Sequence, residues 1–151
     1  MARHELTRVS KYSAREMFDM VADVASYQQF LPLVQQSTVF DIEDETDGIL
    51  KFKGRLQVAK QNLNISEAFI SDVVANRNDL TIVSIASNGP VKHLSNIWKF
   101  AELQNGGSQS RLILEYEIAS LPMRMLMKAS SGIVMEKLTE AFENRAKQLY
   151  G

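Results

Sequence analysis

Residues 122–151 read PMRMLMKASSGIVMEKLTEAFENRAKQLYG, and this stretch decides the fold. Pro122 suits the first turn of a helix, where its missing N–H has no intrahelical partner. Steps of three or four residues then predict one helical face, formed by Met123, Met127, Ser130, Val134, Leu138, Phe142 and Leu149. Such a helix is roughly 40 Å long. The rest of a short chain must therefore wrap around it.

The first half of this helix is rich in methionine. Four of the seven methionines in the chain lie there, at Met123, Met125, Met127 and Met135. Unbranched methionine side chains fill irregular gaps and adapt to variable partners. Two interpretations follow, because these residues can fill an ordinary core or can form one wall of a pocket for an apolar ligand.

Composition limits the classes of function. A chain of 151 residues is predicted to form a single domain, residues 1–151. The formal net charge of −1 gives no reason to expect DNA binding. The chain has no cysteine, which excludes disulfides and thiolate catalysis. Its two histidines, His4 and His93, are far apart in sequence, so we expect neither a metal site nor a bound cofactor.

No apolar run approaches the length that spans a membrane, and the N-terminus lacks the apolar core of a signal peptide. We therefore expect a soluble, cytoplasmic protein. Any membrane contact is expected to be transient and peripheral, at the inner membrane.

The hydrophobic pattern changes twice along the chain. After a strand near residues 3–10, Ser13 and Glu16 match a capping box that begins a short helix. A further helical turn ends before Pro32. Side chains then alternate with a period of two, which predicts strands at 34–43, 50–58, 63–73, 80–87, 94–100 and 112–118. The order predicts an α+β fold in which a curved antiparallel sheet of six to seven strands wraps around the C-terminal helix.

Three polar groups interrupt the apolar faces of these strands. Glu67 and Asn96 each lie between two apolar positions of an alternating strand, and Tyr116 carries a hydroxyl on another. Such groups are costly to bury unless they are hydrogen-bonded. Glu67 is either paired with a structural partner or serves with Asn96 to orient a ligand in an apolar pocket. Tyr116 is either a half-buried aromatic or a third polar contact.

A row of basic residues, Lys51, Lys53 and Arg55, lies on the opposite face of its strand. Charges on an exposed sheet face usually serve solvation. The alternative is an anionic partner such as ribosomal RNA or membrane headgroups.

A family resemblance extends from about residue 3 to the end of the chain. It is carried by Tyr12-Ser13, Glu16-Met17-Phe18, Val21, Asp23-Val24, Tyr27, Phe30-Leu31-Pro32, Gly89-Pro90, His93-Leu94, Trp98, Phe100, Ala141-Phe142, Arg145-Ala146 and Leu149-Tyr150-Gly151. In this order and spacing the residues resemble the coenzyme Q-binding, START-like family, which also contains the bacterial RatA-type ribosome association toxins. Members are often labelled polyketide cyclase or dehydrase.

The resemblance implies a helix-grip fold with a cavity between the sheet and the C-terminal helix. It also implies binding of ubiquinone or a similar prenyl lipid, in support of respiration. Our leading hypothesis is a non-enzymatic lipid-binding module. The ligand-binding residues we expect are Leu56, Phe69, Trp98, Phe100, Tyr116, Met127 and Val134, with Glu67 and Asn96 as polar contacts.

Two alternatives remain open. The first is a RatA-type regulator that binds the large ribosomal subunit through Lys51, Lys53 and Arg55 and blocks subunit association. The second is a cyclase that uses Glu67 as a base, for which the sequence offers no second catalytic group.

Overall fold

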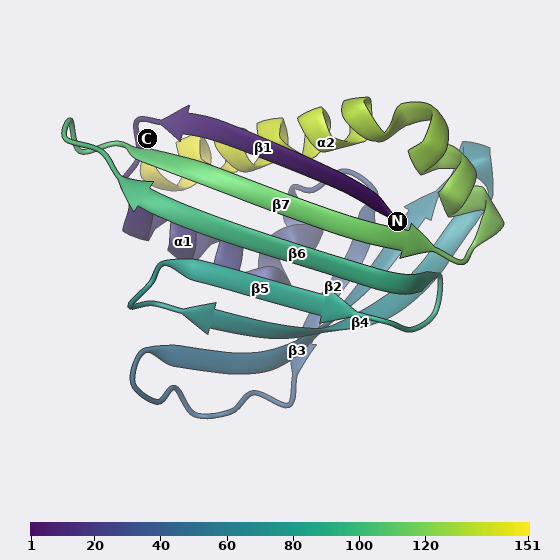
Figure 1. The fold of residues 1–151 in the computed structure, drawn as a ribbon, viewed down its shortest axis with the longest axis horizontal. Coiled ribbons are helices and arrows are strands. Elements are labelled where there is room, and N and C mark those ends of the chain that lie inside the picture. The colour runs from purple at the N-terminus through teal and green to yellow at the C-terminus, as the bar shows by residue number, and fades with distance from the viewer.

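A computed structural model describes all residues, Met1–Gly151 (Figure 1). The elements, in chain order, are β1 (Ala2–Ser10), α1 (Ala14–Ala22), the 3₁₀ helix η1 (Val24–Gln29), β2 (Val34–Phe40), β3 (Ile49–Lys60), the 3₁₀ turn η2 (Gln61–Leu63), β4 (Ile65–Asn76), β5 (Thr81–Ala86), β6 (Val91–Glu102), β7 (Ser108–Ile118) and α2 (Leu121–Tyr150). The predicted order of a strand, short helices, a run of strands and a long helix is confirmed.

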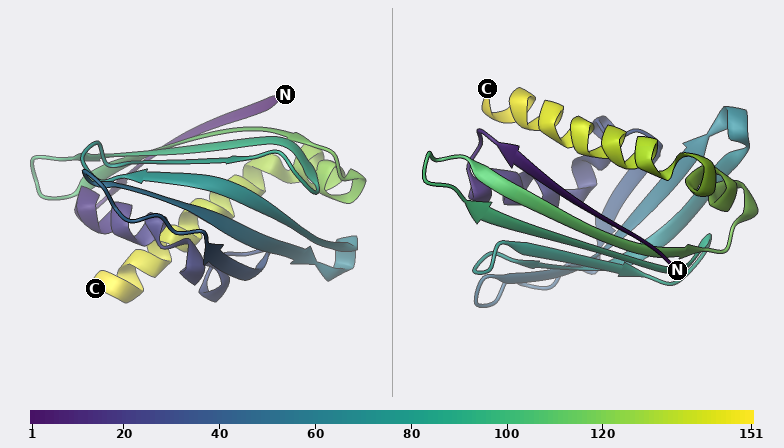
Figure 2. Two further views of the ribbon diagram at one scale, coloured as in Figure 1. Left: turned by 90° about the horizontal axis from the view of Figure 1, so that it is seen from below. Right: turned by 45° about the horizontal axis from the view of Figure 1, so that its top comes forward.

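The seven strands form one antiparallel sheet in the order β1-β7-β6-β5-β4-β3-β2. The first strand pairs with the last, so the chain must cross to the opposite edge through α1 and η1 before it starts β2. Helices α1 and α2 lie on the same side of the curved sheet (Figure 2). The predicted architecture, a curved antiparallel sheet that wraps around the C-terminal helix, is confirmed.

Helix α1 begins at the predicted capping box. The Ser13 hydroxyl accepts a hydrogen bond from the Glu16 N–H (3.1 Å), and the Glu16 carboxylate accepts one from the Ser13 N–H (3.0 Å). The helix buries its apolar face almost completely, and Phe18 meets Phe100 of β6 edge to face with ring centroids 6.3 Å apart. Helix α1 therefore fills one end of the concave face with packed side chains.

Helix α2 has a kink, which the prediction of one long helix from Pro122 did not include. Ser130 departs from helical geometry (φ −139°, ψ 18°), and it begins a Ser-Ser-Gly run of the kind at which helices bend. Leu149, which the period placed on the buried face, is 48% exposed, and the last turns bury Phe142 and Ala146 and half-bury Tyr150 instead. Neither α2 nor any other helix is long and apolar enough to cross a membrane.

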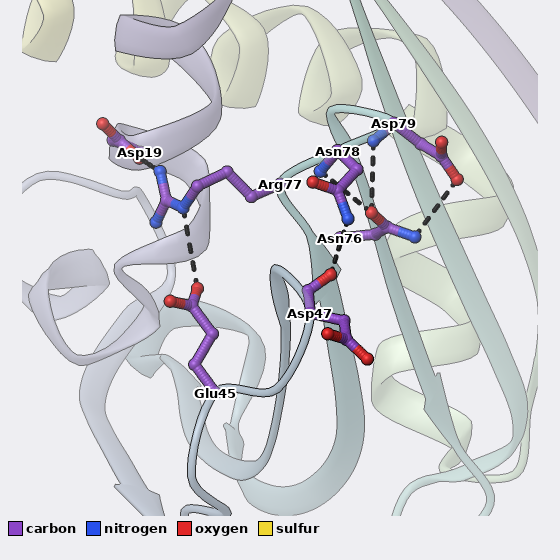
Figure 3. A network of polar contacts seen from close by, with 7 residues as sticks. All are labelled: Asp19, Glu45, Asp47, Asn76, Arg77, Asn78 and Asp79. Atoms are coloured by element: carbon purple, nitrogen blue, oxygen red, sulfur yellow. Dashed lines mark hydrogen bonds and ion pairs between the residues drawn. The ribbon is translucent and has the colours of Figure 1, made fainter.

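The turn between β4 and β5 connects α1 to the loop between β2 and β3 (Figure 3). The Arg77 guanidinium donates to Asp19 of α1 at 2.7 Å and lies 3.6 Å from the carboxylate of Glu45. It also lies over the Phe18 ring, 5.3 Å from its centroid. The hydrogen bond to Asp19 raises the pKa of Arg77 above its ordinary value. This network fixes the packed end of the fold.

Candidate functional site

A cavity of about 230 Å³ lies between the concave face of the sheet and α2. Its wall comprises 25 residues, of which 19 are hydrophobic and none is charged. The wall draws on η1 and the loop after it, on strands β2 to β7, and on the middle of α2. The cavity therefore occupies the part of the concave face that α1 leaves uncovered.

Six of the nine residues predicted to bind ligand lie in this wall. They are Leu56, Phe69, Asn96, Trp98, Met127 and Val134. The other three, Glu67, Phe100 and Tyr116, lie outside it. The six share the period-two face of their strands or the three-and-four spacing of the helix, which is the pattern that identified them. Their contact with a ligand stays a prediction.

Phe100 and Tyr116 face the concave side but contact other groups. Phe100 is stacked on Trp98 (5.8 Å between centroids) and meets Phe18 edge to face, in the core at the α1 end. The Tyr116 hydroxyl lies 3.2 Å from Nε2 of His4, and the two rings are stacked. Burial raises the pKa of Tyr116. Both residues thus serve packing beside the cavity, which corrects the expectation that they line it.

Glu67 lies where the sheet separates. Strand β5 pairs only with residues 72–76 of β4. On that side, the first half of β4 is bordered by the loop after β5. The Asn88 side chain of this loop accepts a hydrogen bond from the Ile70 N–H (2.9 Å) and donates one to the Ile70 carbonyl (2.7 Å). Glu67 lines an open hollow at this separation together with Gly89 and Ser120. One carboxylate oxygen of Glu67 is buried without a partner. Glu67 therefore lies in this separate hollow and not in the cavity wall.

An aromatic cluster closes one side of the cavity around Phe142 of α2. The Phe142 ring meets Trp98, Tyr27 and Phe30 edge to face, with centroids 5.3, 5.5 and 5.4 Å apart. The Tyr27 hydroxyl donates to the Val21 carbonyl, and burial followed by the nearby charge of Asp23 raises its pKa. Only the Tyr27 ring is thus available to a ligand. Phe142 was not predicted as a site residue, although it repeats the helical spacing of Val134.

The loop after η1 is fastened against the rest of the wall. Leu33 has a left-handed backbone (φ 71°), and its carbonyl accepts from the Ala59 N–H at 2.9 Å. Arg145 of α2 donates to Gln29 at 2.7 Å, and its guanidinium lies over the Phe30 ring. A left-handed leucine is costly and persists only where the surroundings impose it. The loop is thus a fixed part of the wall.

Four uncharged polar side chains lie in the wall, namely Ser71, Ser84, Asn96 and Thr139. The Thr139 hydroxyl lies 3.1 and 2.9 Å from the carbonyls of Met135 and Glu136, so it is already engaged by its own helix. Asn96 is different, because its Oδ1 is buried and has no hydrogen-bond partner. Buried polar atoms are normally paired. Asn96 is the polar group in the wall that a ligand would satisfy.

Comparison with known proteins identifies relatives of this chain. The family described as polyketide cyclase / dehydrase and lipid transport matches residues 10–143. The chain is 33% identical over 148 residues to the ribosome association toxin RatA of Pseudomonas aeruginosa, covering 93% of this chain and 92% of the relative. It is 28% identical over 149 residues to the mitochondrial coenzyme Q-binding protein COQ10 of Dictyostelium discoideum, covering 97% and 70%.

Solved structures share the fold. The solution structure of the 18 kDa protein CC1736 from Caulobacter crescentus has a TM-score of 0.80 and 25% identity, covering 100% of this chain and 99% of that one. The aromatase/cyclase ZhuI from Streptomyces sp. R1128 has a TM-score of 0.77 at 17% identity, covering 97% and 94%. The chain belongs to the polyketide cyclase / dehydrase and lipid transport family and has its START-like, helix-grip fold.

Proposed function

We propose that this protein binds a neutral, largely apolar molecule of the prenyl-quinone class in its cavity and acts as a carrier. The observation that supports this most is the composition of the wall, which has 19 hydrophobic residues among 25 and no charged side chain. A charged ligand would lose its hydration there without gaining a counter-ion. The coenzyme Q-binding relative supports the choice of a quinone.

The size of the cavity agrees with the head of such a ligand. A dry core cavity of about 150 Å³ admits benzene, whereas this one measures about 230 Å³. That volume suits a substituted ring and the first part of an isoprenoid tail, so the rest of a longer tail must extend out of the cavity. Each buried CH₂ contributes about 0.8 kcal/mol before the costs of association. Binding is therefore expected to depend little on salt.

The absence of acid–base groups from the wall favours a carrier over an enzyme. No His, Asp, Glu, Lys or Arg lines the cavity, and the Tyr27 hydroxyl is engaged by Val21. Glu67, the candidate base, lies in the separate hollow. The likeness to an aromatase/cyclase at 17% identity concerns the fold alone. A cyclase function would require turnover that Glu67→Gln abolishes.

Trp98 is the only tryptophan in the chain and lies in the cavity wall, so it reports on ligand binding. Titration with a short-chain ubiquinone should quench its fluorescence. Val134→Phe places a ring in the cavity and should weaken that binding at least tenfold. The matched control is Leu149→Phe on the exposed side of the same helix.

Organic extraction of the protein purified from its native host, followed by mass spectrometry, tests the ligand directly. A co-purified prenyl quinone or related neutral lipid is expected. If extracts hold none and quinone neither quenches Trp98 nor shifts the melting temperature, the proposal fails.

A second candidate function is binding to the large ribosomal subunit. It is supported by the RatA relatives and by the exposed basic row on β3. Within that row Lys53 pairs with Asp72 at 2.9 Å and Arg55 donates to Gln57 at 3.3 Å, which leaves Lys51 without a close partner. Co-sedimentation with large subunits should then weaken with salt and in the Lys51→Glu/Arg55→Glu variant. Sedimentation that the variant leaves unchanged would remove this surface as the contact.

A further inference from the structure

The first segment of α2, before the kink at Ser130, carries an exposed face of mixed character. Four residues lie on one side of this segment, because steps of three, one and three residues separate them: Leu121, Arg124, Met125 and Lys128. All four are exposed, Leu121 at 58% and Met125 at 62%. Met127, on another side of the same segment, lines the cavity.

The charge on this segment has one sign. No acidic residue occurs between Leu121 and Met135, and neither Arg124 nor Lys128 takes part in an ion pair. Unpaired cations beside exposed Leu and Met side chains characterise helices that lie in the interface of an anionic membrane. Leu121 and Met125 are four residues apart and so adjacent on the helix surface, which distinguishes them from exposed apolar residues that are scattered singly.

The hairpin between β3 and β4 continues this surface. Its turn and the first segment of α2 lie at the same end of the molecule in all three views (Figures 1 and 2). The turn exposes Leu63, and the neighbouring Lys60 has no ion-pair partner. The same end of the fold therefore repeats the combination of an apolar side chain with an unpaired cation.

We propose that this end of the molecule docks on the surface of an anionic lipid bilayer, with Leu121 and Met125 in the interface and Arg124 and Lys128 against the lipid phosphates. The docked segment is also part of the cavity wall through Met127. A ligand could then pass between the bilayer and the cavity at the point of contact. That last step rests on the proposed function, whereas the docking itself does not.

Flotation with vesicles tests the docking. The full chain should bind vesicles of phosphatidylcholine that contain phosphatidylglycerol and should bind pure phosphatidylcholine much less. Each neutralised cation should weaken binding about fivefold, so Arg124→Gln/Lys128→Gln should reduce it at least tenfold. Leu121→Ser/Met125→Ser should reduce it by a similar factor, because it removes the inserted side chains. All four changes are on exposed side chains, and circular dichroism should verify an unchanged fold.

Matched controls keep the result specific. Val9→Ser/Ile85→Ser removes two apolar side chains that are 68% and 47% exposed on the sheet, and Lys51→Gln/Lys99→Gln removes two exposed cations. Both controls should bind vesicles like the unchanged protein. Equal loss in the controls, or equal binding to both kinds of vesicle, would overturn the docking surface. Loss of ribosome co-sedimentation in the α2 variants without any vesicle binding would assign the surface to the ribosome and also overturn it.

Quenching of Trp98 by a short-chain ubiquinone separates this inference from the proposed function. The α2 variants should keep their quinone affinity, because the changed side chains do not line the cavity. Quinone binding without vesicle binding would overturn the docking alone. Vesicle binding without quinone binding would uphold the docking and overturn the proposed ligand.

Discussion

Ser84 of β5 and Asn96 of β6 are direct antiparallel partners, and both belong to the wall of the cavity. Their strands bring two polar side chains together in a wall that is otherwise mostly hydrophobic. The Asn96 Oδ1 atom has no hydrogen-bond partner, although it is buried. An unpaired buried polar group lowers the stability of a fold, and proteins retain such groups chiefly where function requires them.

Replacing Asn96 should therefore affect stability and binding in opposite directions. Asn96→Leu is expected to raise the free energy of unfolding by about 1 kcal/mol, because the unpaired carboxamide is removed. The same change should weaken binding of the reduced quinol about fivefold, because its hydroxyl would lose the Asn96 Oδ1 as a hydrogen-bond acceptor. Urea denaturation and Trp98 fluorescence measure the two quantities.

Asn88 provides the control for this prediction. Its carboxamide makes two hydrogen bonds with the backbone of Ile70, so Asn88→Leu should destabilise the fold by about 1 kcal/mol and leave quinol affinity unchanged. If Asn96→Leu destabilises the protein as Asn88→Leu does, then Asn96 is a structural residue and its assignment to the site is wrong.

The same reasoning from sequence predicted both residues in the cavity wall, where Asn96 lies and Glu67 does not. Both are polar residues at positions where the strand pattern expects apolar ones, and the pattern fixes only the face on which a side chain lies. Glu67 lies in a separate hollow with Gly89 and Ser120. How far the cavity extends along β4 is set by tertiary packing, which the strand pattern does not encode. Ser84 carried no comparable signal, because a small hydroxyl in a β-branched strand is common.

The fold itself was predictable because its elements have strong local patterns. The capping box at Ser13 and the alternation along β3 to β7 lead directly to the observed order. The kink at Ser130 was not predicted, although Ser-Ser-Gly is visible in the sequence, because the period on both sides of it fits a single straight helix. The place of the Leu33 loop in the cavity wall was not predictable, because it depends on tertiary contacts that the hydrophobic period does not encode.

Phe142 should contribute far more to stability than the exposed residues of its helix. Its ring contacts Trp98, Tyr27 and Phe30, and it is almost fully buried. Phe142→Ala is expected to lower the free energy of unfolding by about 3 kcal/mol. Chemical denaturation followed by far-UV circular dichroism measures this change.

The control for Phe142 is Leu149→Ala, which should change the free energy of unfolding by less than about 0.5 kcal/mol, since the residue is largely exposed. Similar losses in both variants would mean that the C-terminal half of α2 packs differently from the arrangement described above.

Arg77 should stabilise the packed end of the fold through several weak contacts. It reaches Asp19, Glu45 and the Phe18 ring from one turn. The ion pairs are partly exposed, so Arg77→Ala is expected to cost about 1 kcal/mol. High salt should reduce the difference between variant and parent by screening the pairs. Arg15→Ala, on the exposed side of α1 and without an ion pair, should be close to neutral.

Glu143 of α2 should make stability depend on pH. Burial raises the pKa of its carboxyl, and the attraction of Arg8 and a hydrogen bond from Ser10 oppose that shift without cancelling it. The folded protein therefore holds this proton more tightly than the unfolded chain does, so protonation favours folding. The resulting stability is fully present below the unfolded pKa and is lost as the pH rises through the folded pKa. At neutral pH the ionised Glu143 carboxylate therefore destabilises the fold.

Glu143→Gln imitates the protonated carboxyl at every pH. The variant should melt at a higher temperature than the parent at pH 7, and the two melting temperatures should converge as the pH falls to about 4, the unperturbed range of glutamate. Glu140→Gln, at an exposed position of the same helix, should show no such convergence. A Glu143→Gln variant that melts below the parent at pH 7 would mean that the contacts of the ionised carboxylate with Arg8 and Ser10 outweigh its desolvation, and the sign of the pKa shift would then be reversed.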